Sequence, residues 1–399
     1  MPLGLYISVP FCRTKCSYCN FASDVFSKAV FGKYVDRVCS DIANAYRIAE
    51  EMGGELDGAV DTIYLGGGTP TVLDPAELRR IFAAVRNRFE VQADAEITVE
   101  CAPGTLTPAI IASLVSSGVN RVSLGLQSFV DKEAAAVGRL HTRETTLADI
   151  ARLRAAGISN INLDLIAGLP YQTMESWLYS LEEVIATGAP HVSVYMLEVD
   201  DDSRLGRELI AGGTKYHAHF VPDEDLTADL YGIACERLHA AKVDQYEISN
   251  FARAGFESRH NLKYWTRRPY LGFGVDAHSM LPSLDPGAEA VRFSTPDSLE
   301  EFMAVRPATR TVVSSRAALE ESFFLGLRLT KGVSLEKMRS QFGTFVVTQL
   351  SPILVDLASL ELIDWSGDNV RLTPRGRLLS NEAFERFLQN LNHPDPQPS

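Results

Sequence analysis

Short apolar runs alternate with helical segments through the first two hundred residues of this 399-residue chain. The runs lack a strict alternation of apolar and polar residues, which is typical of strands buried on both faces. Strands separated by helices indicate βαβ units and a parallel sheet. The expected strands are 5–9, 62–65, 97–99, 122–126, 161–166 and 192–196. Six units are too few for a complete eight-stranded barrel, so the sequence predicts a partial (β/α)6 barrel.

The expected barrel takes up residues 1–280, and a small second domain follows it. Residues 281–297 hold three prolines and a glycine, which predicts a linker. Residues 298–390 show helical patterns and then a hairpin signal at Ser366-Gly367-Asp368, which indicates a mainly helical, winged-helix-like domain. The proline-containing end, 391–399, is expected to be disordered.

The net charge of the chain argues against some classes of binding partner. The formal net charge is -13, which disfavours a nonspecific grip on nucleic acid or anionic lipid. No run of about 18 apolar residues is present, so we expect no membrane span. The N-terminus does not resemble a signal peptide, and we therefore expect a cytoplasmic protein whose thiols stay reduced. The oligomeric state stays open.

Three of the six cysteines lie within eight residues, directly after the first expected strand. Cys12, Cys16 and Cys19 have the spacing C-x3-C-x2-C. Three thiolates on one loop can each bind one iron of a [4Fe-4S] cluster, which leaves the fourth iron open to a small molecule. A structural zinc site usually takes four ligands from two separated pairs, and the sequence has no second pair. We therefore interpret the loop as a cluster site.

Polar residues and glycines end the next expected strands. Gly66–Gly68, followed by Thr69, comes after the second strand, and the loop has no Gly-Lys-Ser/Thr of a P-loop. Glu100 and Gln127 end the third and fourth strands, and Asp164 lies near the end of the fifth. Polar groups at carboxyl ends of barrel strands build active sites. Each residue alone could be a solvated side chain or a helix cap, but together they predict a site beside the cysteines.

The cysteine loop, with Tyr18 before its last cysteine, resembles the radical S-adenosylmethionine (SAM) superfamily. Longer stretches are similar to the oxygen-independent coproporphyrinogen III oxidase family. These stretches are 5–12, 66–70, 123–129 and 162–170, with 325–329 and 372–376 similar to the family's small C-terminal domain. The resemblance spans nearly the whole chain. It implies a radical SAM barrel that carries a [4Fe-4S] cluster on Cys12, Cys16 and Cys19, with SAM on the open iron.

The same resemblance assigns the SAM contacts residue by residue. A SAM on the cluster would be contacted by Tyr6, Gly67 and Glu100. A second SAM-sized site would be lined by Tyr18, Gly68, Thr69, Gln127, Arg139 and Asp164. Tyr18 stands where the true oxidases have phenylalanine, which is a mild departure from the pattern.

Two features separate the branches of this family. The decarboxylating oxidases carry a further cysteine two residues after the third cluster ligand, and here that position is Phe21. The segment His260-Asn261-Leu262-Lys263-Tyr264-Trp265 has the H-N-x-x-Y-W pattern typical of the haem-chaperone branch. Both features imply a protein that binds haem and delivers it to an apo-haemoprotein such as a respiratory cytochrome. Coproporphyrinogen oxidase activity is expected to be absent, and whether the chain is an enzyme stays open.

The H-N-x-x-Y-W segment has two interpretations. A neutral His260 imidazole suits the axial position of haem iron, and Tyr264 and Trp265 could stack on a porphyrin. Basic residues that could meet haem propionates surround the segment: Arg253, Arg259, Lys263, Arg267 and Arg268. His278 is a second candidate ligand. In the other interpretation, His260 is a hydrogen-bonded, semi-buried histidine and the aromatic residues belong to the core.

Two other functions remain to be weighed. The alternative function is that of an oxygen-independent coproporphyrinogen III oxidase, which decarboxylates propionate side chains by radical SAM chemistry. Radical SAM modification of RNA is disfavoured, because the chain is acidic and has no basic or aromatic RNA-binding appendage.

Overall fold

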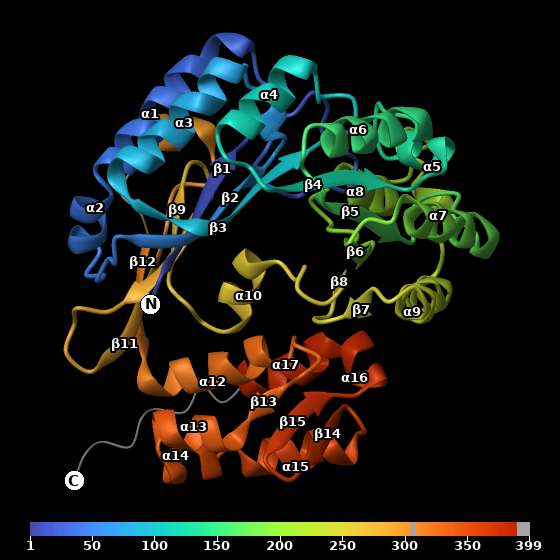
Figure 1. The fold of residues 1–399 in the computed structure, drawn as a ribbon. Coiled ribbons are helices and arrows are strands. Elements are labelled where there is room, and N and C mark those ends of the chain that lie inside the picture. Colours follow the sequence, from blue (N-terminus) through green and yellow to red (C-terminus); the bar gives the residue numbers. More distant parts are fainter. Residues whose placement is uncertain (305–308, 389–399) are drawn as a thin grey trace.

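The computed structural model describes residues 1–304 and 309–388 (Figure 1). Within these residues one sheet of twelve strands runs in the order β12-β11-β10-β9-β1-β2-β3-β4-β5-β6-β8-β7. Its curved centre is parallel and consists of β1 (Leu3–Val9), β2 (Ala59–Gly67), β3 (Glu90–Cys101), β4 (Arg121–Gln127), β5 (Asn160–Ala167) and β6 (His191–Met196). The predicted partial barrel is confirmed.

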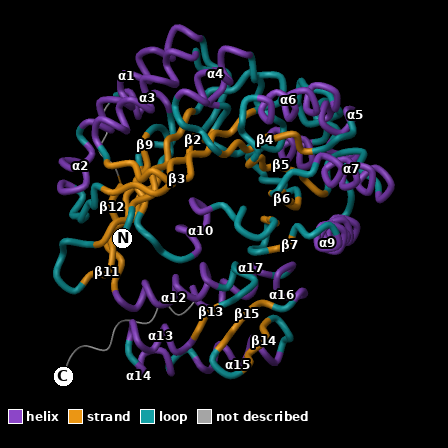
Figure 2. Tube along the Cα trace, in the orientation of Figure 1, coloured by secondary structure: helices purple, strands orange, loops and turns teal. Residues whose placement is uncertain are grey.

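Helices cover the convex face of the barrel, as Figures 1 and 2 show. They are α1 (Phe31–Ala43), α2 (Ala45–Glu51), α3 (Pro75–Arg88), α4 (Pro108–Ser116), α5 (Asp131–Ala136), α6 (Arg143–Ala155) and α7 (Met174–Thr187). Local chemistry fixes where they begin. In α3, for example, Asp74 and Glu77 form a capping box and Pro75 occupies the first turn.

Each barrel strand has an apolar and a polar side, so the expected lack of alternation is wrong, although both sides are largely buried. In β5 the residues Ile161, Leu163 and Leu165 are completely buried in the main hydrophobic core, while Asn162 and Asp164 alternate with them. Successive side chains of a strand point to opposite faces, and the helices lie on the convex face. The core therefore lies between sheet and helices, and the concave face is left for polar side chains.

The sheet extends beyond the barrel at both edges. On one side β9 (Tyr270–Phe273) runs parallel to β1 and is followed by β10 (His278–Pro282), β11 (Ala288–Ser294) and β12 (Thr309–Ser314), each antiparallel to its neighbour. On the other side β8 (Asn250–Ala252) and β7 (Asp244–Gln245) follow β6. These strands were absent from the sequence prediction.

The predicted linker at 281–297 is wrong. It holds the end of β10 and all of β11, which pair from His278 with Ser294 to Pro282 with Ala290. Pro282 ends β10, and Pro286 and Gly287 lie in the reversal of this hairpin, where Gly287 has the positive φ of +78° that such a turn requires. Pro296 follows β11. The sheet therefore continues into β12, beyond the predicted domain boundary at residue 298.

The C-terminal unit has a hydrophobic core of its own, in which Phe323 and Phe387 stack at 5.4 Å between ring centroids. Its elements are α12 (Ser315–Gly326), β13 (Val333–Ser334), α13 (Leu335–Phe342), α14 (Thr344–Thr348), α15 (Ser351–Ser359), β14 (Ile363–Ser366), β15 (Asn369–Leu372), α16 (Pro374–Leu378) and α17 (Ser380–Leu388). The predicted hairpin is confirmed, since β14 and β15 pair around Gly367. The predicted disordered tail, 391–399, lies outside the described residues.

The H-N-x-x-Y-W segment forms the short helix α10 (Arg259–Trp265), which lies in the open centre of the arc between the barrel and the C-terminal unit (Figure 2). Its N-terminus is fixed to β3, because the carboxylate of Glu96 accepts hydrogen bonds from the backbone N–H groups of Arg259 and His260, both at 3.0 Å. The remaining helices are α8 (Arg204–Ala211), α9 (Glu224–Ala240) and α11 (Leu299–Met303). Among the described residues, no helix has the length and apolarity needed to cross a bilayer.

Candidate functional site

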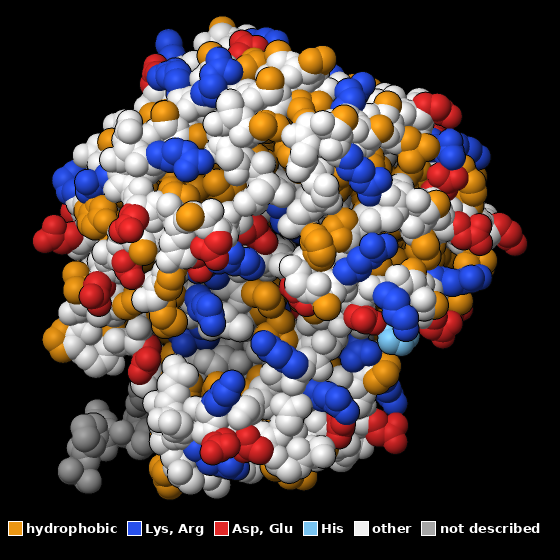
Figure 3. All heavy atoms as spheres, in the orientation of Figure 1, with side chains coloured by type: hydrophobic (Ala, Val, Ile, Leu, Met, Phe, Trp, Pro, Cys, Tyr) orange, Lys and Arg blue, Asp and Glu red, His pale blue; other side chains and the backbone are white. Residues whose placement is uncertain are grey.

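A cavity of about 780 Å³ opens on the concave side of the barrel. Its walls come from the cysteine loop, the ends and inner faces of β2 to β6, and α16 and α17 of the C-terminal unit. Figure 3 shows Lys and Arg side chains gathered over the middle of the face that joins the two units. Eleven of the predicted cofactor residues line the cavity: Cys12, Cys16, Tyr18, Cys19, Gly67, Gly68, Thr69, Glu100, Gln127, Arg139 and Asp164.

One backbone hydrogen bond closes the cysteine loop on itself, and another ties it to the end of α5. The Cys12 N–H donates to the carbonyl of Asp24 at 3.0 Å, and the Ser17 N–H donates to that of Val137 at 3.2 Å. All three cysteines are free thiols, and burial raises the pKa of Cys12. No three His, Cys, Asp or Glu side chains of the described residues surround one ion position. A four-iron cluster binds each thiolate through a separate iron, so its ligands need not converge on one point.

The glycine loop continues the pairing of β1 and β2 into the cysteine loop. The Gly68 N–H donates to the carbonyl of Val9 at 2.9 Å, and the Thr69 N–H donates to that of Phe11 at 2.8 Å. A Cβ atom on Gly68 would lie only 2.7 Å from that Val9 oxygen. The close backbone approach therefore requires glycine, and it leaves a wall without side chains beside the cysteines.

Glu100 is the acidic group nearest this wall. Its carboxylate accepts hydrogen bonds from the Tyr64 hydroxyl at 2.8 Å and from the Gly67 N–H at 3.2 Å. Burial raises the pKa of Glu100 to about 7, although both hydrogen bonds act against this shift. A cationic ligand placed here would favour the ionised carboxylate, so the site is suited to bind an ammonium group.

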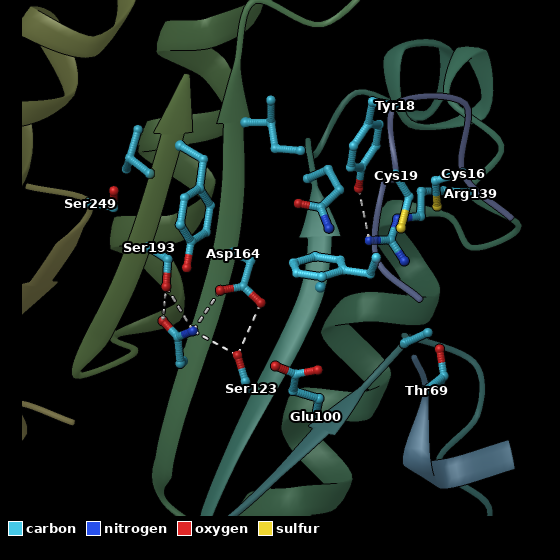
Figure 4. A pocket seen from close by; sticks show the side chains of 18 of the residues that line it. Cys16, Tyr18, Cys19, Thr69, Glu100, Ser123, Arg139, Asp164, Ser193 and Ser249 are labelled. Atoms are coloured by element: carbon cyan, nitrogen blue, oxygen red, sulfur yellow. Dashed lines mark hydrogen bonds between the residues drawn. The ribbon is translucent and has the colours of Figure 1, made fainter. Parts of the chain in front are cut away.

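The cavity also holds the predicted polar residues Tyr18, Arg139 and Asp164. The Arg139 guanidinium donates to the Tyr18 hydroxyl at 3.1 Å. Asp164 accepts from Ser123 at 3.0 Å and from Asn162 at 2.7 Å, and burial raises its pKa. Figure 4 shows Asp164 and Ser123 facing the same space as Glu100, with Tyr18, Arg139 and the cysteines on the other side. The predicted second group is thus divided across the cavity, with Asp164 on one side and Tyr18 and Arg139 beside the cysteines on the other.

Gln127 reaches this cavity through an irregular strand end. The pairing of β4 with β5 shifts register between Gly125 and Gln127. Gln127 adopts a φ of +72°, which is uncommon for a residue other than glycine. Such a bulge redirects a side chain at the end of a strand, so the irregularity explains how Gln127 comes to line the cavity.

Tyr6 is the one predicted cofactor residue outside the main cavity. It lines a second, smaller cavity of about 260 Å³, which also contacts Phe21, Tyr264 and His278. Gly67 lines both cavities, and burial raises the pKa of Tyr6. The structure therefore places Tyr6 behind the glycine wall.

In this structure both ring nitrogens of His260 have hydrogen-bond partners, as the second interpretation of the segment expects, and a contact of His260 with haem stays a prediction. The side chain is 1% exposed, and its Nδ1 and Nε2 share hydrogen bonds of 2.9 Å with the hydroxyls of Thr62 and Tyr264. Burial lowers the pKa of His260 to about 3, so the ring is neutral at physiological pH. His260 is a structural histidine that fixes α10 to β2.

The aromatic residues of the same helix have separate roles. Tyr264 packs edge-on against Tyr270, with ring centroids 4.6 Å apart, and lines the second cavity. Trp265 lies under the guanidinium of Arg328, which is 4.3 Å from its ring centroid. The segment therefore joins the barrel to the C-terminal unit through Trp265, and only Tyr264 of the three predicted haem contacts lines either of these cavities.

Three of the five basic residues predicted to meet haem propionates are paired with carboxylates. The Lys263 ammonium lies 2.6 Å from the carboxylate of Asp61, and the Arg267 guanidinium lies 2.9 Å from that of Glu321. Arg259 lies within ion-pair distance of Asp61. These charges anchor the helix to acidic partners that are distant in sequence.

Several cavity residues were not singled out from the sequence. They are Tyr64, Arg121, Ser123, Asn162, Ser193, Asn250 and Asn261. A signal for some of them was available, because Asn162 and Asp164 alternate with apolar residues in β5, as Arg121 and Ser123 do in β4. Which of these side chains lie next to one another depends on the register between strands, and the register is known only from the folded sheet.

Comparison with known proteins adds independent information. The family model described as Radical SAM superfamily matches residues 6–184, and the HemN C-terminal domain matches residues 313–379. A protein named heme chaperone HemW from Bacillus subtilis is 34% identical, and the match covers 97% of this chain and 99% of that protein. The protein of the same name from Lactococcus lactis is 32% identical and covers 97% of each.

Among solved structures, coproporphyrinogen III oxidase (HemN) from Escherichia coli, described as a radical SAM enzyme, matches with a TM-score of 0.81. The match covers 97% of this chain and 90% of that chain, at 23% identity. At that identity, the likeness is evidence for the fold.

Proposed function

This chain belongs to the family of the heme chaperone HemW, and from this membership we propose that it binds haem and delivers it to apo-haemoproteins. One observation carries the proposal: relatives with that name match over nearly their full length, at 34% identity for the Bacillus subtilis protein. We propose respiratory cytochromes as the clients. We place the protein in the cytoplasm, where thiol ligands stay reduced.

A [4Fe-4S] cluster fits the cysteine loop in our proposal. Cys12, Cys16 and Cys19 would hold it as three free thiols on an anchored loop. The glycine wall beside them is so close that a Cβ on Gly68 would meet backbone oxygen at 2.7 Å, which suits an approach by a bound molecule. When bound, the cluster would supply single electrons to SAM.

Different polar side chains of the cavity would bind the SAM on the cluster and a second SAM molecule. Glu100, fixed by Tyr64 and the Gly67 N–H, would bind the ammonium group of the methionine part. A second SAM molecule would be bound by Tyr18, Arg139 and Asp164, with Gly68, Thr69 and Gln127 around it. Burial of these groups excludes water and strengthens each polar contact.

The alternative is an oxygen-independent coproporphyrinogen III oxidase, which the shared fold permits. We favour haem handling because Phe21 stands where the resemblance expects the further cysteine of the decarboxylating oxidases. Phe21 is 66% exposed and lines both cavities. An apolar, exposed side chain at this rim cannot supply the missing thiol, and it suits contact with a porphyrin edge or a client protein.

One anaerobic sample tests both functions. The chain is reconstituted with iron and sulfide, titrated with haem by absorbance, and then assayed with coproporphyrinogen III, SAM and a reductant. We expect near-stoichiometric haem binding and no decarboxylated product. Decarboxylation without haem binding would reverse the assignment. Cys16→Ala, which removes one proposed cluster ligand, is the control for any activity that depends on the cluster.

A further inference from the structure

A buried arginine without a partner lies inside the barrel. Arg121 is the first residue of β4, is 1% exposed and lines the main cavity. Its Nε has no hydrogen-bond partner in the described part of the chain, and no ion pair of Arg121 occurs there. Buried charges in proteins are nearly always paired. An unpaired guanidinium that faces a cavity therefore indicates an anion that the cavity receives.

The polar residues around Arg121 are bonded to one another. The Asn162 amide donates to Ser123, Asp164 and Ser193, at 2.7 to 2.9 Å. His191 shares hydrogen bonds with Asn162 at 2.6 Å and with the Tyr246 hydroxyl at 2.9 Å. These side chains therefore find their hydrogen-bond partners among themselves, and none of them accepts a hydrogen bond from the Arg121 guanidinium.

The carboxylates of the cavity do not take up these donors. The oxygens of Glu100 bond to Tyr64 and Gly67, and those of Asp164 bond to Ser123 and Asn162. Burial raises the pKa of Glu100 and Asp164, and the charge of Arg121 opposes this shift only as a smaller effect. Arg121 thus acts on them through space and remains free for a ligand.

Two further donor side chains line the same cavity. Asn261, from the H-N-x-x-Y-W helix, lines it next to the buried His260. Arg328 enters from the C-terminal unit, and its Nε has no hydrogen-bond partner within the described ranges. Arg328 lies 3.7 Å from Glu247, so part of its charge is compensated. Arg139 lines the cavity too, but it donates to Tyr18. Among the arginines that line the cavity, Arg121 is therefore the one for which the described residues provide neither a hydrogen bond nor an ion pair.

We propose that Arg121 is the recognition residue of an anion subsite in the main cavity, and that it binds a propionate carboxylate of haem. The planar guanidinium offers parallel N–H donors that match a carboxylate in two-point geometry. The low-dielectric surroundings strengthen such a pair. The inference rests on the proposed haem binding. The other source of a carboxylate in this cavity is the amino-acid part of SAM, which the test must separate.

The test uses the full reconstituted chain and two porphyrins: haem, and haem dimethyl ester, in which both carboxylates are blocked. Wild type, Arg121→Gln and Arg121→Lys are titrated with each porphyrin, and SAM binding is measured in parallel. Arg88→Gln is the matched control, because Arg88 lies at the end of α3 over the ring of Tyr46 and does not line the main cavity. Thermal unfolding checks that every variant is folded.

We expect wild type and Arg88→Gln to prefer haem over the ester by about tenfold or more. Arg121→Gln should lose this preference and unfold at no lower temperature than wild type, since it removes an unpaired buried charge. Arg121→Lys keeps the charge but lacks the paired N–H donors of the guanidinium, so it should retain part of the preference. This variant also covers the case in which the Gln variant does not fold.

An equal preference in wild type and Arg121→Gln would overturn the inference. A loss confined to SAM binding would assign the carboxylate to SAM and would also overturn it. Wild type that binds neither porphyrin would instead contradict the proposed function.

Discussion

The Nε2 atom of His260 and the hydroxyl of Tyr264 share a hydrogen bond of 2.9 Å inside the helix of the H-N-x-x-Y-W segment. The other ring nitrogen bonds to Thr62 of β2. The histidine therefore links the helix to the barrel and holds Tyr264 against Tyr270, at the edge of the second cavity. In this arrangement Tyr264 and Asn261 line the two cavities, while His260 stabilises the helix that carries them.

Replacing His260 should destabilise the fold. His260→Ala leaves the buried hydroxyls of Thr62 and Tyr264 without a partner and opens a cavity, so we expect a loss of about 2–4 kcal/mol in the free energy of unfolding. Chemical denaturation of the full chain measures it. His278→Ala, at an exposed residue, should change stability by less than about 0.5 kcal/mol. A fully stable His260→Ala protein that has lost its haem spectrum would instead identify His260 as an iron ligand.

The same histidine should make stability depend on pH. Burial lowers the pKa of His260 to about 3, whereas an unfolded histidine titrates near 6.5. The unfolded state therefore binds a proton that the folded state excludes, and the stabilisation present above pH 6.5 is lost as the pH falls toward 3. The slope is at most about 1.4 kcal/mol per pH unit for this one group.

His260→Gln, which cannot titrate, isolates this effect. Denaturation of wild type and variant at pH 7 and pH 5 should show a stability difference that shrinks at the lower pH. Parallel curves for the two proteins would show that His260 does not titrate on unfolding.

How much the sequence predicts depends on the range of the interactions involved. The six barrel strands, the cysteine loop and the residues Glu100, Gln127 and Asp164 follow from local patterns, because each strand end carries its own side chain to the same edge. The edge hairpin of β10 and β11 was missed, since its prolines also fit a linker and only pairing with the rest of the sheet decides between the two.

The state of His260 could not be derived from its neighbours in sequence. Its partner Thr62 lies 198 residues away, and Lys263 is neutralised by Asp61, which is also distant. Arg121 was missed for the same reason, because its lack of a partner becomes visible only when the surrounding network is complete.

Glu100 should govern SAM binding and its pH dependence. Because the pKa of Glu100 is about 7 before a ligand binds, the carboxylate that would hold the SAM ammonium is only partly ionised at neutral pH. SAM affinity should rise as the pH increases from 6 to 8 and then level off. Glu100→Gln should weaken SAM binding about tenfold or more and abolish this rise. Equilibrium binding of SAM to the reconstituted protein measures both effects, and an unchanged pH profile in the variant would exclude Glu100 as the ammonium partner.

Gly68 should be essential for assembly of the cofactor site. A methyl group at this position would meet the backbone oxygens of Val9 and Phe11 at 2.7 and 2.8 Å, and backbone atoms cannot move aside as a side chain can. Gly68→Ala should therefore lower the iron and sulfide content after reconstitution by more than half. Gly232→Ala, in helix α9 where no atom lies within 4 Å of the added methyl group, should reconstitute like wild type. Equal iron content in both variants would contradict the tight packing of this loop.

Transfer of haem to an acceptor tests the central claim most directly. The reconstituted protein is loaded with one equivalent of haem and mixed with increasing concentrations of an apo-cytochrome, and the rate of transfer is compared with the rate of haem loss to a nonspecific scavenger. A haem chaperone should transfer haem faster than it releases it, at a rate that increases with acceptor concentration. A rate that is independent of the acceptor and equal to spontaneous release would contradict the account.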